Sequence, residues 1–465
     1  MIRLVPALLT LLILLPVQTA HAGSTEVGIA DDRILMAGGR AADLAVAEWR
    51  AMGVDTVRIF ALWSRIAPAT RPAGFDGADP ASPGYFWAPL DAAVARVRNA
   101  GMRVTLTITG PGPLWTSSSP SRRRPAYRPQ PSAYAAFATA VARRYGADVN
   151  RYLLWNEPNI AAWLAPQARC ARRRCTPVSP HVYRGLVRAA YPAVRRADPG
   201  AQVVIGVLSP RGQRLRRSDT VMRPLVFLRA FGCRSGRWTR LRIKECRGFR
   251  PATGDGFAIH PYSSLGAPER GHRNRDDVSL AQVGNLAATL DRLQRARAVR
   301  ATTRRFGIYI DEYGYQTNPP DRFAGIRPRR QDSYLQRAAY VAWRNPRVRL
   351  FTQYLWRDEP RSSDRSFGGW QSGLRYVGGR AKPALAHFDT PFVLDAARNR
   401  LWGQVRPGGA HTVTVQRRTA ARRTWRKLAV VRTDRRGYWK LKRRLVRGTS
   451  YRYRAAGATS ATLRR

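Results

Sequence analysis

Short runs of apolar and β-branched residues recur through the first 395 residues and alternate with longer amphipathic stretches. This alternation predicts parallel β-strands joined by crossover helices. Several runs are apolar at successive positions, as expected of strands that are buried on both faces. Eight strands are predicted, over Glu26–Ala30, Thr56–Leu62, Arg103–Thr109, Arg151–Trp155, Gln202–Val207, Gly256–His260, Gly307–Asp311 and Leu350–Leu355.

The stretches between these runs have helical periodicity. In the first of them Leu44, Ala45, Trp49 and Met52 share one helix face. Eight strands interleaved with helices predict an α/β fold, a (β/α)8 TIM barrel, with polar loops decorating its mouth. Six helices are predicted, over Ala41–Met52, Pro89–Ala100, Ser132–Tyr145, Pro180–Ala197, Ser279–Ala298 and Asp332–Asn345.

The pattern changes near residue 395. Between 401 and 465 the chain holds 19 Lys and Arg residues and one acidic residue, Asp434. In several segments apolar and polar residues roughly alternate with a period of two, and turn signals separate these segments. The pattern predicts a small all-β, sandwich-like domain over 396–465, after a barrel domain over 23–395. The segments are Thr412–Gln416, Lys427–Arg432, Tyr438–Lys442 and Tyr451–Arg454.

The first 22 residues are typical of a secretory signal peptide. Arg3 precedes an apolar run over 7–15, and Ala-His-Ala at 20–22 fits the cleavage rule. This run is too short to span a membrane, and no later stretch reaches about 18 apolar residues. We therefore predict no transmembrane segment and a secreted protein, which associates with the cell wall in one interpretation. A retained N-terminal anchor is the alternative, and export is expected in either case.

The four cysteines agree with export, because disulfides persist in oxidising compartments. Four cysteines allow three pairings. Pairing between sequence neighbours, Cys170 with Cys175 and Cys233 with Cys246, is the simplest and closes two small loops. A four-cysteine zinc site is the alternative, although the spacings match no standard zinc knuckle.

The formal net charge is +53, and most of the basic residues are arginine. A basic surface attracts anionic partners. No helix-turn-helix, zinc-finger or RNA-recognition signature is present, so no specific nucleic-acid binding is predicted. Because the arginines are scattered through every segment, a biased coding composition accounts for most of them. An anionic cell-wall polymer, bound through the basic C-terminal domain, is the second interpretation.

The strongest chemical signal is Trp155-Asn156-Glu157-Pro158, directly after the fourth predicted strand. A barrel builds its active site at the C-terminal ends of its strands, so Glu157 is placed for catalysis. Asn156 could hydrogen-bond a sugar hydroxyl. The alternative is an Asn-Glu pair that only begins a helix.

A second carboxylate, Glu312, ends the seventh predicted strand within Ile310-Asp311-Glu312-Tyr313. The fourth and seventh strands face each other across an eight-stranded barrel. Two carboxylates on opposite sides of a bound sugar are what glycoside hydrolysis requires, and retaining enzymes hold them about 5–5.5 Å apart. One then acts as acid and base, and the other attacks the anomeric carbon.

The order strand–Asn-Glu-Pro, then strand–Glu, resembles the clan of retaining (β/α)8-barrel glycoside hydrolases that includes family 5 cellulases and family 39 xylosidases. The resemblance covers roughly residues 26–392. It implies that Glu157 is the acid/base, Glu312 the nucleophile, and Asn156 the partner of the sugar 2-hydroxyl. The Asn-Glu-Pro motif is a moderately specific signal for this clan, and the glutamate after strand seven is a weak signal by itself. The two motifs together, each at the end of the expected strand, are a strong signal.

Further positions fit the same resemblance. Arg58 on the second strand matches the clan's arginine beneath the nucleophile, where a guanidinium would keep the carboxylate ionised. His260 and Tyr262 match the strand-six pair, whose tyrosine orients the nucleophile. For each of the three, the alternative is a buried polar residue with a purely structural role.

Three tryptophans are candidate sugar platforms. Trp356 closes the eighth strand, where the clan places an aromatic floor for the sugar ring. Trp63 and Trp115 follow the second and third strands and could stack on sugars. Packing in the core is the alternative for all three.

Other acidic residues near strand ends are competing candidates. Asp358 and Glu359 follow the eighth strand and are expected to be solvated loop charges. Asp31 and Asp32 follow the first strand and are expected in an exposed loop. Strand alternation directs Asp311 away from the face of its neighbour, which makes it a poor nucleophile.

These observations predict a secreted retaining glycoside hydrolase that acts on a polysaccharide or oligosaccharide. No phosphate loop, HExxH or Gly-x-Ser-x-Gly motif is present, and the mechanism requires no metal or cofactor. Three alternatives remain open: a non-catalytic carbohydrate- or wall-binding protein, a nucleic-acid binder and a transglycosylase.

Overall fold

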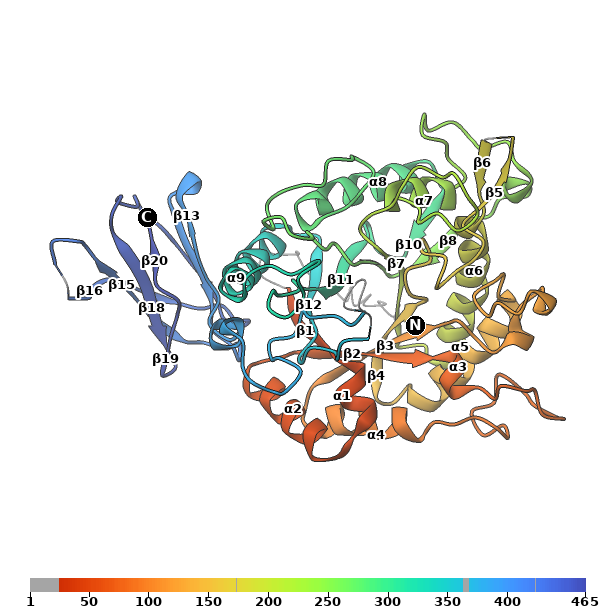
Figure 1. Cartoon of the computed structure of the whole chain (residues 1–465), viewed down its shortest axis with the longest axis horizontal. Helices are drawn as coiled ribbons and strands as arrows, with labels where there is room; N and C mark the ends of the chain where they lie inside the picture. The colour runs from red at the N-terminus through yellow and green to blue at the C-terminus, as the bar shows by residue number, and fades with distance from the viewer. Residues whose placement is uncertain (1–24, 173, 363–367, 423) are drawn as a thin grey trace, which may run out of the picture.

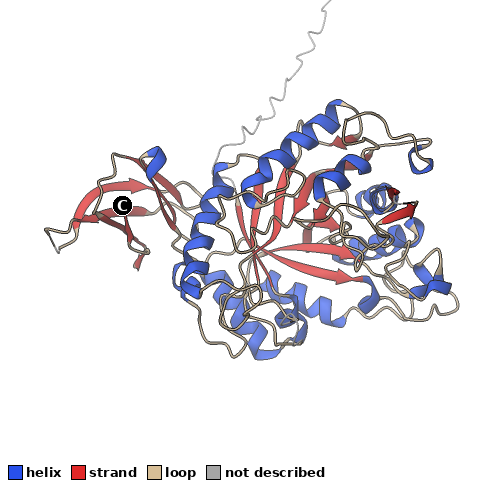
Figure 2. Cartoon of the chain, turned by 45° about the horizontal axis from the view of Figure 1, so that its top comes forward, coloured by secondary structure: helices blue, strands red, loops and turns tan. Residues whose placement is uncertain are grey.

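A computed structural model describes residues 25–172, 174–362, 368–422 and 424–465. Its centre is a closed barrel of eight parallel strands, which follow one another around the barrel in chain order. Figure 1 shows the barrel strands, and Figure 2 shows the helices that surround them. The barrel strands are β1 (Glu26–Ala30), β2 (Thr56–Leu62), β3 (Arg103–Thr109), β4 (Val149–Leu154), β7 (Gln202–Leu208), β9 (Gly256–Ile259), β11 (Gly307–Tyr313) and β12 (Val348–Tyr354).

The eight predicted strands are the eight strands of this barrel, so the predicted fold class is confirmed. The six predicted helices also exist, with ends that shift by a few residues. The pattern missed three short helices, which have too few turns for clear periodicity: α1 (Asp32–Ala37), α3 (Trp63–Ile66) and α7 (Pro224–Phe231). The other helices are α2 (Gly39–Ala51), α4 (Ala88–Asn99), α5 (Pro131–Tyr145), α6 (Ser179–Ala197), α8 (Val283–Arg295) and α9 (Pro328–Arg344).

Side chains fill the barrel interior, as in other barrels of this size. Leu153, Val204, Tyr309 and Leu350 belong to one cluster of buried residues from four different strands. Two short strand pairs lie outside the barrel. They are β5 (Ala168–Ala171) with β6 (Arg174–Pro177), and β8 (Ala252–Gly254) with β10 (Val299–Ala301).

The C-terminal domain consists of two antiparallel sheets around a core of its own. It begins with β13, which pairs with β14, so the unit starts earlier than the predicted boundary at 396. The strands are β13 (Phe392–Asp395), β14 (Arg400–Gln404) and β17 (Tyr438–Lys442) in one sheet, and β15 (Thr412–Arg418), β16 (Arg426–Arg432), β18 (Ser450–Ala455), β19 (Ala458–Thr459) and β20 (Leu463–Arg464) in the other.

This domain packs against the end of the barrel that lies opposite the strand C-termini. Arg436 pairs with Asp55, which directly precedes β2, at 3.1 Å. The Tyr438 hydroxyl donates to the carbonyl of Thr25, which directly precedes β1, at 3.1 Å. Trp402 packs against Trp343 of α9 with 5.7 Å between ring centroids. The C-terminal domain therefore lies beside the barrel, at the end where β1 and β2 begin (Figure 1).

Both predicted disulfides are present, Cys170–Cys175 across the β5–β6 pair and Cys233–Cys246 in the loop after α7. Among the described residues, no helix has the length and apolar character that crossing a bilayer needs. The predicted signal peptide, residues 1–22, lies outside the described residues.

Candidate active site

Asn156 and Glu157 lie at the mouth of the barrel, shortly after the end of β4. Glu157 has a φ of 36°, in the left-handed region that few residues other than glycine adopt. Its N–H donates to the carbonyl of Val207 at 2.8 Å, which ties this backbone to β7. Such backbone strain concentrates at functional sites, where the surrounding structure holds it in place.

Glu312 lies within β11, and its side chain is almost fully buried. Its Oε1 accepts a hydrogen bond from Nη2 of Arg58, a fully buried arginine on β2. Its Oε2 accepts a hydrogen bond from the Tyr262 hydroxyl at 3.1 Å. Two donors from different strands thus fix both oxygens of this carboxylate.

His260, at the end of β9, connects the two glutamates. Its Nδ1 lies 3.0 Å from Oε1 of Glu157 and 3.5 Å from Oε2 of Glu312. Because both oxygens contact the same nitrogen, they are at most about 6.5 Å apart, within the range that two-carboxylate catalysis on a sugar uses. The structure therefore brings Glu157, Glu312, Arg58, His260 and Tyr262 into one site.

Burial and the nearby charges shift the pKa values of Glu312 and His260 in opposite directions. Burial raises the pKa of Glu312, and the nearby cations His260 and Arg58 lower it, leaving the pKa above its ordinary value. Burial would lower the pKa of His260, but Glu312 and Asp311 raise it well above its ordinary range. The charge of His260 is therefore tied to the charges of Glu312 and Asp311.

Asp311 belongs to this network, contrary to the prediction from strand alternation. Its Oδ2 lies 3.1 Å from Nε2 of His260. The pairing of β11 with β12 shifts register between Ile310 and Tyr313, and such an irregularity disturbs the regular alternation of side chains. Both neighbouring carboxylates consequently reach the same imidazole, one on each ring nitrogen.

Asp32 is also a member of the site, although an exposed loop was expected. Its Oδ2 pairs with Nη1 of Arg58 at 3.1 Å, and its Oδ1 accepts the N–H of Phe60 at 2.5 Å. Arg58 therefore lies between two carboxylates, Asp32 and Glu312. Asp31 is buried and caps α1, accepting the N–H of Ile34 at 3.3 Å.

Asn156 is buried beside Glu157, and its Oδ1 has no hydrogen-bond partner in the described part of the chain. A buried amide oxygen without a partner costs free energy, which a ligand hydroxyl would recover. Asn156 is therefore suited to receive a polar group of a bound molecule, as its sequence context predicts.

The aromatic platform differs from the prediction. Trp356 is buried against Trp49 of α2, with ring centroids 6.3 Å apart, and Trp63 is buried in a stack with Phe137 of α5. Neither ring has a free face for a sugar, so these two predictions are wrong. Trp115 donates its indole N–H to the carbonyl of Pro68 and packs on Phe75, and its role stays a prediction.

Tyr354 and Trp370 are aromatic residues that contact the carboxylate site and each other. Tyr354 ends β12, its ring centroid lies 5.8 Å from the Arg58 guanidinium, and burial together with Glu312 raises its pKa well above the ordinary value. Trp370 is 40% exposed and stacks on Tyr262 with 5.4 Å between centroids. Trp370 lies far from any predicted strand end, so the sequence offered no signal for it.

Asp358 is not a solvated loop charge. Its Oδ1 lies 2.7 Å from the Nζ of Lys382, and both side chains are fully buried. Burial lowers the pKa of this lysine to about 8. This ion pair anchors the loop after β12 and does not reach the two glutamates.

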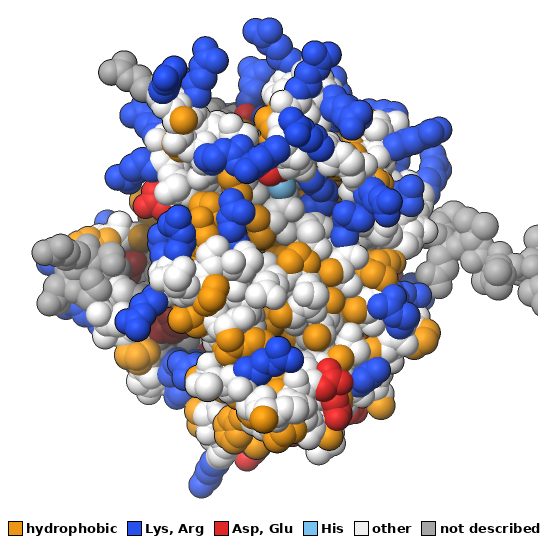
Figure 3. Space-filling view, turned by 90° about the vertical axis from the view of Figure 1, so that its right-hand side faces the viewer, with side chains coloured by type: hydrophobic (Ala, Val, Ile, Leu, Met, Phe, Trp, Pro, Cys, Tyr) orange, Lys and Arg blue, Asp and Glu red, His pale blue; other side chains and the backbone are white. Residues whose placement is uncertain are grey.

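A cavity of about 780 Å³ opens beside the carboxylates. Asp32, Phe60 and Tyr354 line this cavity and also contact Arg58, so the cavity adjoins the residues that surround this arginine. The remaining wall is mostly apolar and includes Phe86, which is 60% exposed. Figure 3 faces the barrel mouth and shows hydrophobic side chains across its middle and lower part, with Lys and Arg crowded above them.

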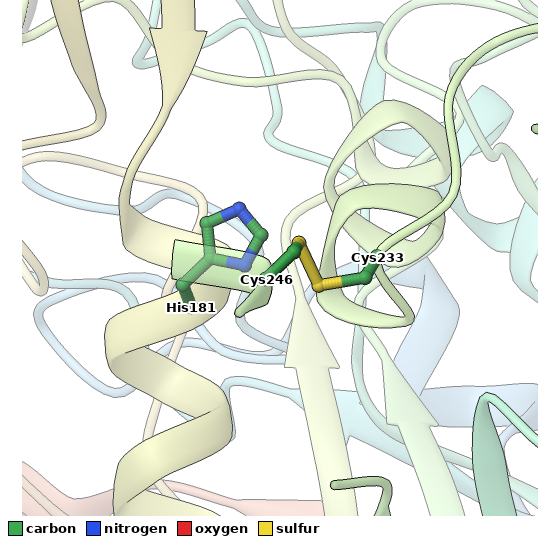
Figure 4. A group of neighbouring side chains, drawn as sticks. All are labelled: His181, Cys233 and Cys246. Carbon is green, nitrogen blue, oxygen red and sulfur yellow. A yellow bond between two sulfur atoms is a disulfide. The ribbon is translucent and has the colours of Figure 1, made fainter. Parts of the chain in front are cut away.

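The described residues hold one group of three potential metal ligands, His181, Cys233 and Cys246 (Figure 4). Both sulfurs are engaged in the disulfide, which leaves one imidazole nitrogen as a ligand. Burial and the neighbouring Arg184 lower the pKa of His181 to about 3. The chemistry of these groups therefore does not suit a metal ion.

The similarity of this chain to known proteins lies in its fold. No protein-family model matches the chain, and no curated protein matches it. A family 39 glycoside hydrolase from the gut symbiont Bacteroides cellulosilyticus WH2 is 15% identical with a TM-score of 0.54, over 90% of this chain and 79% of that one. A GH5_18 protein from Streptomyces cattleya is 17% identical over 78% of each chain, with a TM-score of 0.51. A monomeric beta-xylosidase from Caulobacter crescentus CB15 is 12% identical over 90% and 93% of the chains, also with a TM-score of 0.51. The chain shares the barrel fold of these proteins.

Proposed function

We propose that the protein is a retaining glycoside hydrolase. The observation that carries the proposal is the shared contact of Glu157 and Glu312 with Nδ1 of His260, which keeps their nearest oxygens within about 6.5 Å. Inverting enzymes need roughly 6.5–9.5 Å between carboxyl groups to admit a water molecule. The upper limit of about 6.5 Å for the nearest oxygens meets the lower end of this range, and the assignment of direct attack to Glu312 therefore rests also on its match to the nucleophile of the resembled clan.

The reaction proceeds in two steps. Glu312, held by Arg58 and Tyr262, attacks the anomeric carbon while Glu157 gives its proton to the glycosidic oxygen. The bond to the leaving group breaks as the ester bond to Glu312 forms. A water molecule then attacks the same carbon, gives its proton to Glu157 and releases the carboxylate of Glu312.

The surroundings of the carboxylates supply binding. Asn156 would accept the sugar 2-hydroxyl with its unpartnered Oδ1, and Tyr354 and Trp370 would hold the ring. The adjoining cavity extends the site beyond one sugar, which supports a polysaccharide or oligosaccharide substrate. The shared fold with the glycoside hydrolases above agrees with this proposal. Two disulfides and the predicted signal peptide support export.

The test is azide rescue of two variants on a panel of nitrophenyl glycosides. The Glu157→Ala variant should form the glycosyl ester, which persists until a nucleophile attacks it. Azide should therefore yield a glycosyl azide with the configuration of the substrate. Glu312→Ala lacks the ester step, so azide should attack directly and yield the inverted product. Glu269→Ala, which removes an exposed carboxylate paired with Arg337, is the control and should retain wild-type activity.

Three outcomes would contradict the proposal. Full activity of either glutamate variant on a glycoside that the wild type cleaves would remove that residue from the mechanism. The same azide product from both variants would contradict the assigned roles. Binding of glycans with no turnover of any glycoside would favour the non-catalytic carbohydrate-binding alternative.

A further inference from the structure

The C-terminal domain contains a cavity of about 690 Å³ at the end where β18 begins. Five cationic side chains and no acidic side chain line it, and all five are exposed. Asn399, Leu445 and Val446 complete the lining. The cations are Lys442, Arg443, Arg444, Arg447 and Arg465.

A second cationic feature lies nearby. The guanidinium carbons of Arg418 and Arg452 lie 4.8 Å and 4.2 Å from the ring centroid of Trp425. Nε of Arg452 donates to Oε1 of Gln416 at 2.8 Å, which fixes the position of that guanidinium. Trp425 is half-buried, so part of its indole faces solvent between the two arginines.

Strand register places both features at one end of the sheet. Arg418 of β15 pairs with Ser450 of β18, and Ser450 pairs with Arg464 of β20, which directly precedes Arg465 in the cavity wall. The N–H of Arg465 donates to the carbonyl of Thr449. The cavity and the Trp425 cluster therefore lie at the same end of this sheet, and together they are called the cationic track.

Among the described residues, no carboxylate side chain forms an ion pair with the cations of this track. Asp434 is the single acidic residue between 396 and 465, and its Oδ1 accepts the N–H groups of Arg436 and Tyr438 in a turn on a different strand connection. Burial lowers the pKa of Arg452, and the like charges of Arg454 and Arg418 lower it further. Such a cluster is destabilised by its own repulsion, and a bound anion would relieve it.

We propose that this cationic track binds an anionic polysaccharide, a chain of sugars that carry carboxylates. Guanidinium groups pair with carboxylates in a bidentate geometry, and the several arginines would bind successive sugar units. The exposed part of Trp425 offers apolar surface to a sugar face. The domain contacts the barrel at the end opposite its mouth, so a polymer held here leaves the active site open.

The aromatic residues disfavour nucleic acid as the partner. Binding of single strands uses several aromatic rings on which successive bases stack. Tyr451 and Tyr453 of β18 are buried in the domain core, which leaves Trp425 as the aromatic ring within the described track. A chain of sugars needs no such series of rings.

The test compares two triple variants of the full-length protein for binding to polygalacturonate at about 0.15 M salt. Arg443→Gln/Arg444→Gln/Arg447→Gln removes three charges from the cavity. Arg295→Gln/Arg300→Gln/Arg304→Gln removes three exposed charges from the barrel and has the same net charge. The first should weaken binding by about tenfold or more, and the second by less than about twofold, because screening limits exposed charges to about 8 Å at this salt concentration.

Further measurements separate local recognition from net charge and from catalysis. Neutral dextran should not bind, and turnover of a small soluble glycoside should be unchanged in both variants. Equal weakening by the two triple variants would overturn the proposal, because net charge alone would then account for binding. Tighter binding of single-stranded DNA than of polygalacturonate in the same buffer would also overturn it. This binding assay requires no glycosidase activity, so its result is independent of the proposed function.

Discussion

The whole chain holds 82 Lys and Arg residues and 29 acidic residues, of which 19 and one lie between 401 and 465. In the barrel, three arginines with little solvent exposure pair with acids that the fold brings together. Arg58 pairs with Asp32 and Glu312, Arg151 with Glu26, and Arg347 with Asp291. In the C-terminal domain the arginines on the cationic track face solvent with no acidic side chain beside them.

The comparison separates two uses of one residue type. A buried guanidinium needs polar partners, since an isolated buried charge is expensive, and an acidic partner also holds neighbouring groups in place. A domain can fold without a partner for an exposed guanidinium, which therefore remains available to a ligand. The high net charge of the protein therefore reflects mainly arginines outside the packed core.

Arg58→Gln should produce the largest effect, because it removes a buried charge between two carboxylates. Stability should fall by about 3–5 kcal/mol, measured by urea unfolding, since Asp32 and Glu312 lose their buried partner. In the folded fraction kcat/KM should fall on the order of 100-fold or more. An unfolding midpoint equal to that of the wild type would contradict the structural part of this prediction.

The same variant should change the pH profile. Attack requires ionised Glu312, whose pKa burial raises and Arg58 opposes. Activity is therefore lost as the pH falls through a pKa above that of an ordinary glutamate, and removing Arg58 should move this acidic limb to still higher pH. The measurement is kcat/KM against pH. A limb that stays in place or moves to lower pH would separate Arg58 from the ionisation of Glu312.

Tyr262→Phe should have the next largest effect. It removes the hydroxyl that donates to Oε2 of Glu312 and leaves the stacking with Trp370 intact. A hydrogen bond to a charged group contributes about 1.5–3 kcal/mol, so kcat/KM should fall by roughly 10- to 100-fold. Tyr334→Phe, on the outer helix α9, is the matched control and should behave as the wild type.

Trp370→Ala should affect binding more than chemistry. An aromatic contact contributes about 0.5–1.5 kcal/mol, so KM should rise by roughly 2- to 10-fold while kcat changes little. Phe323→Ala removes another exposed aromatic ring and is the control. A loss confined to kcat would show that Trp370 acts by positioning Tyr262 and not by holding the sugar.

The smallest effect is expected from Arg444→Gln. This side chain is exposed, and no described salt bridge includes it. Unfolding free energy should change by less than about 0.5 kcal/mol, and kcat/KM by less than about twofold. A large loss of stability would show that the track is structural, which would remove the contrast between the two domains.

Much of the fold could be predicted because strand and helix periodicities are local. Apolar runs located all eight barrel strands, and strand ends placed Glu157 and Glu312 at the mouth. Arg58, His260 and Tyr262 were found through the resemblance to known hydrolases, and the structure brings them to the same carboxylates. The cysteine pairing followed from proximity along the chain.

The sequence by itself determined which backbone segments form the barrel and which carboxylates end its strands, because hydrophobic periodicity acts over a few residues. Tertiary structure decided which side chains complete the site. β12 ends at Tyr354, so the chain turns and Trp356 packs on Trp49, while an irregular register in β11 brings Asp311 to His260. Asp32 joins the site through its contact with Arg58, and Trp370 joins it through its contact with Tyr262. Each of these contacts links residues that are distant in sequence. Such contacts depend on how separate strands and loops pack, and no local pattern records that packing.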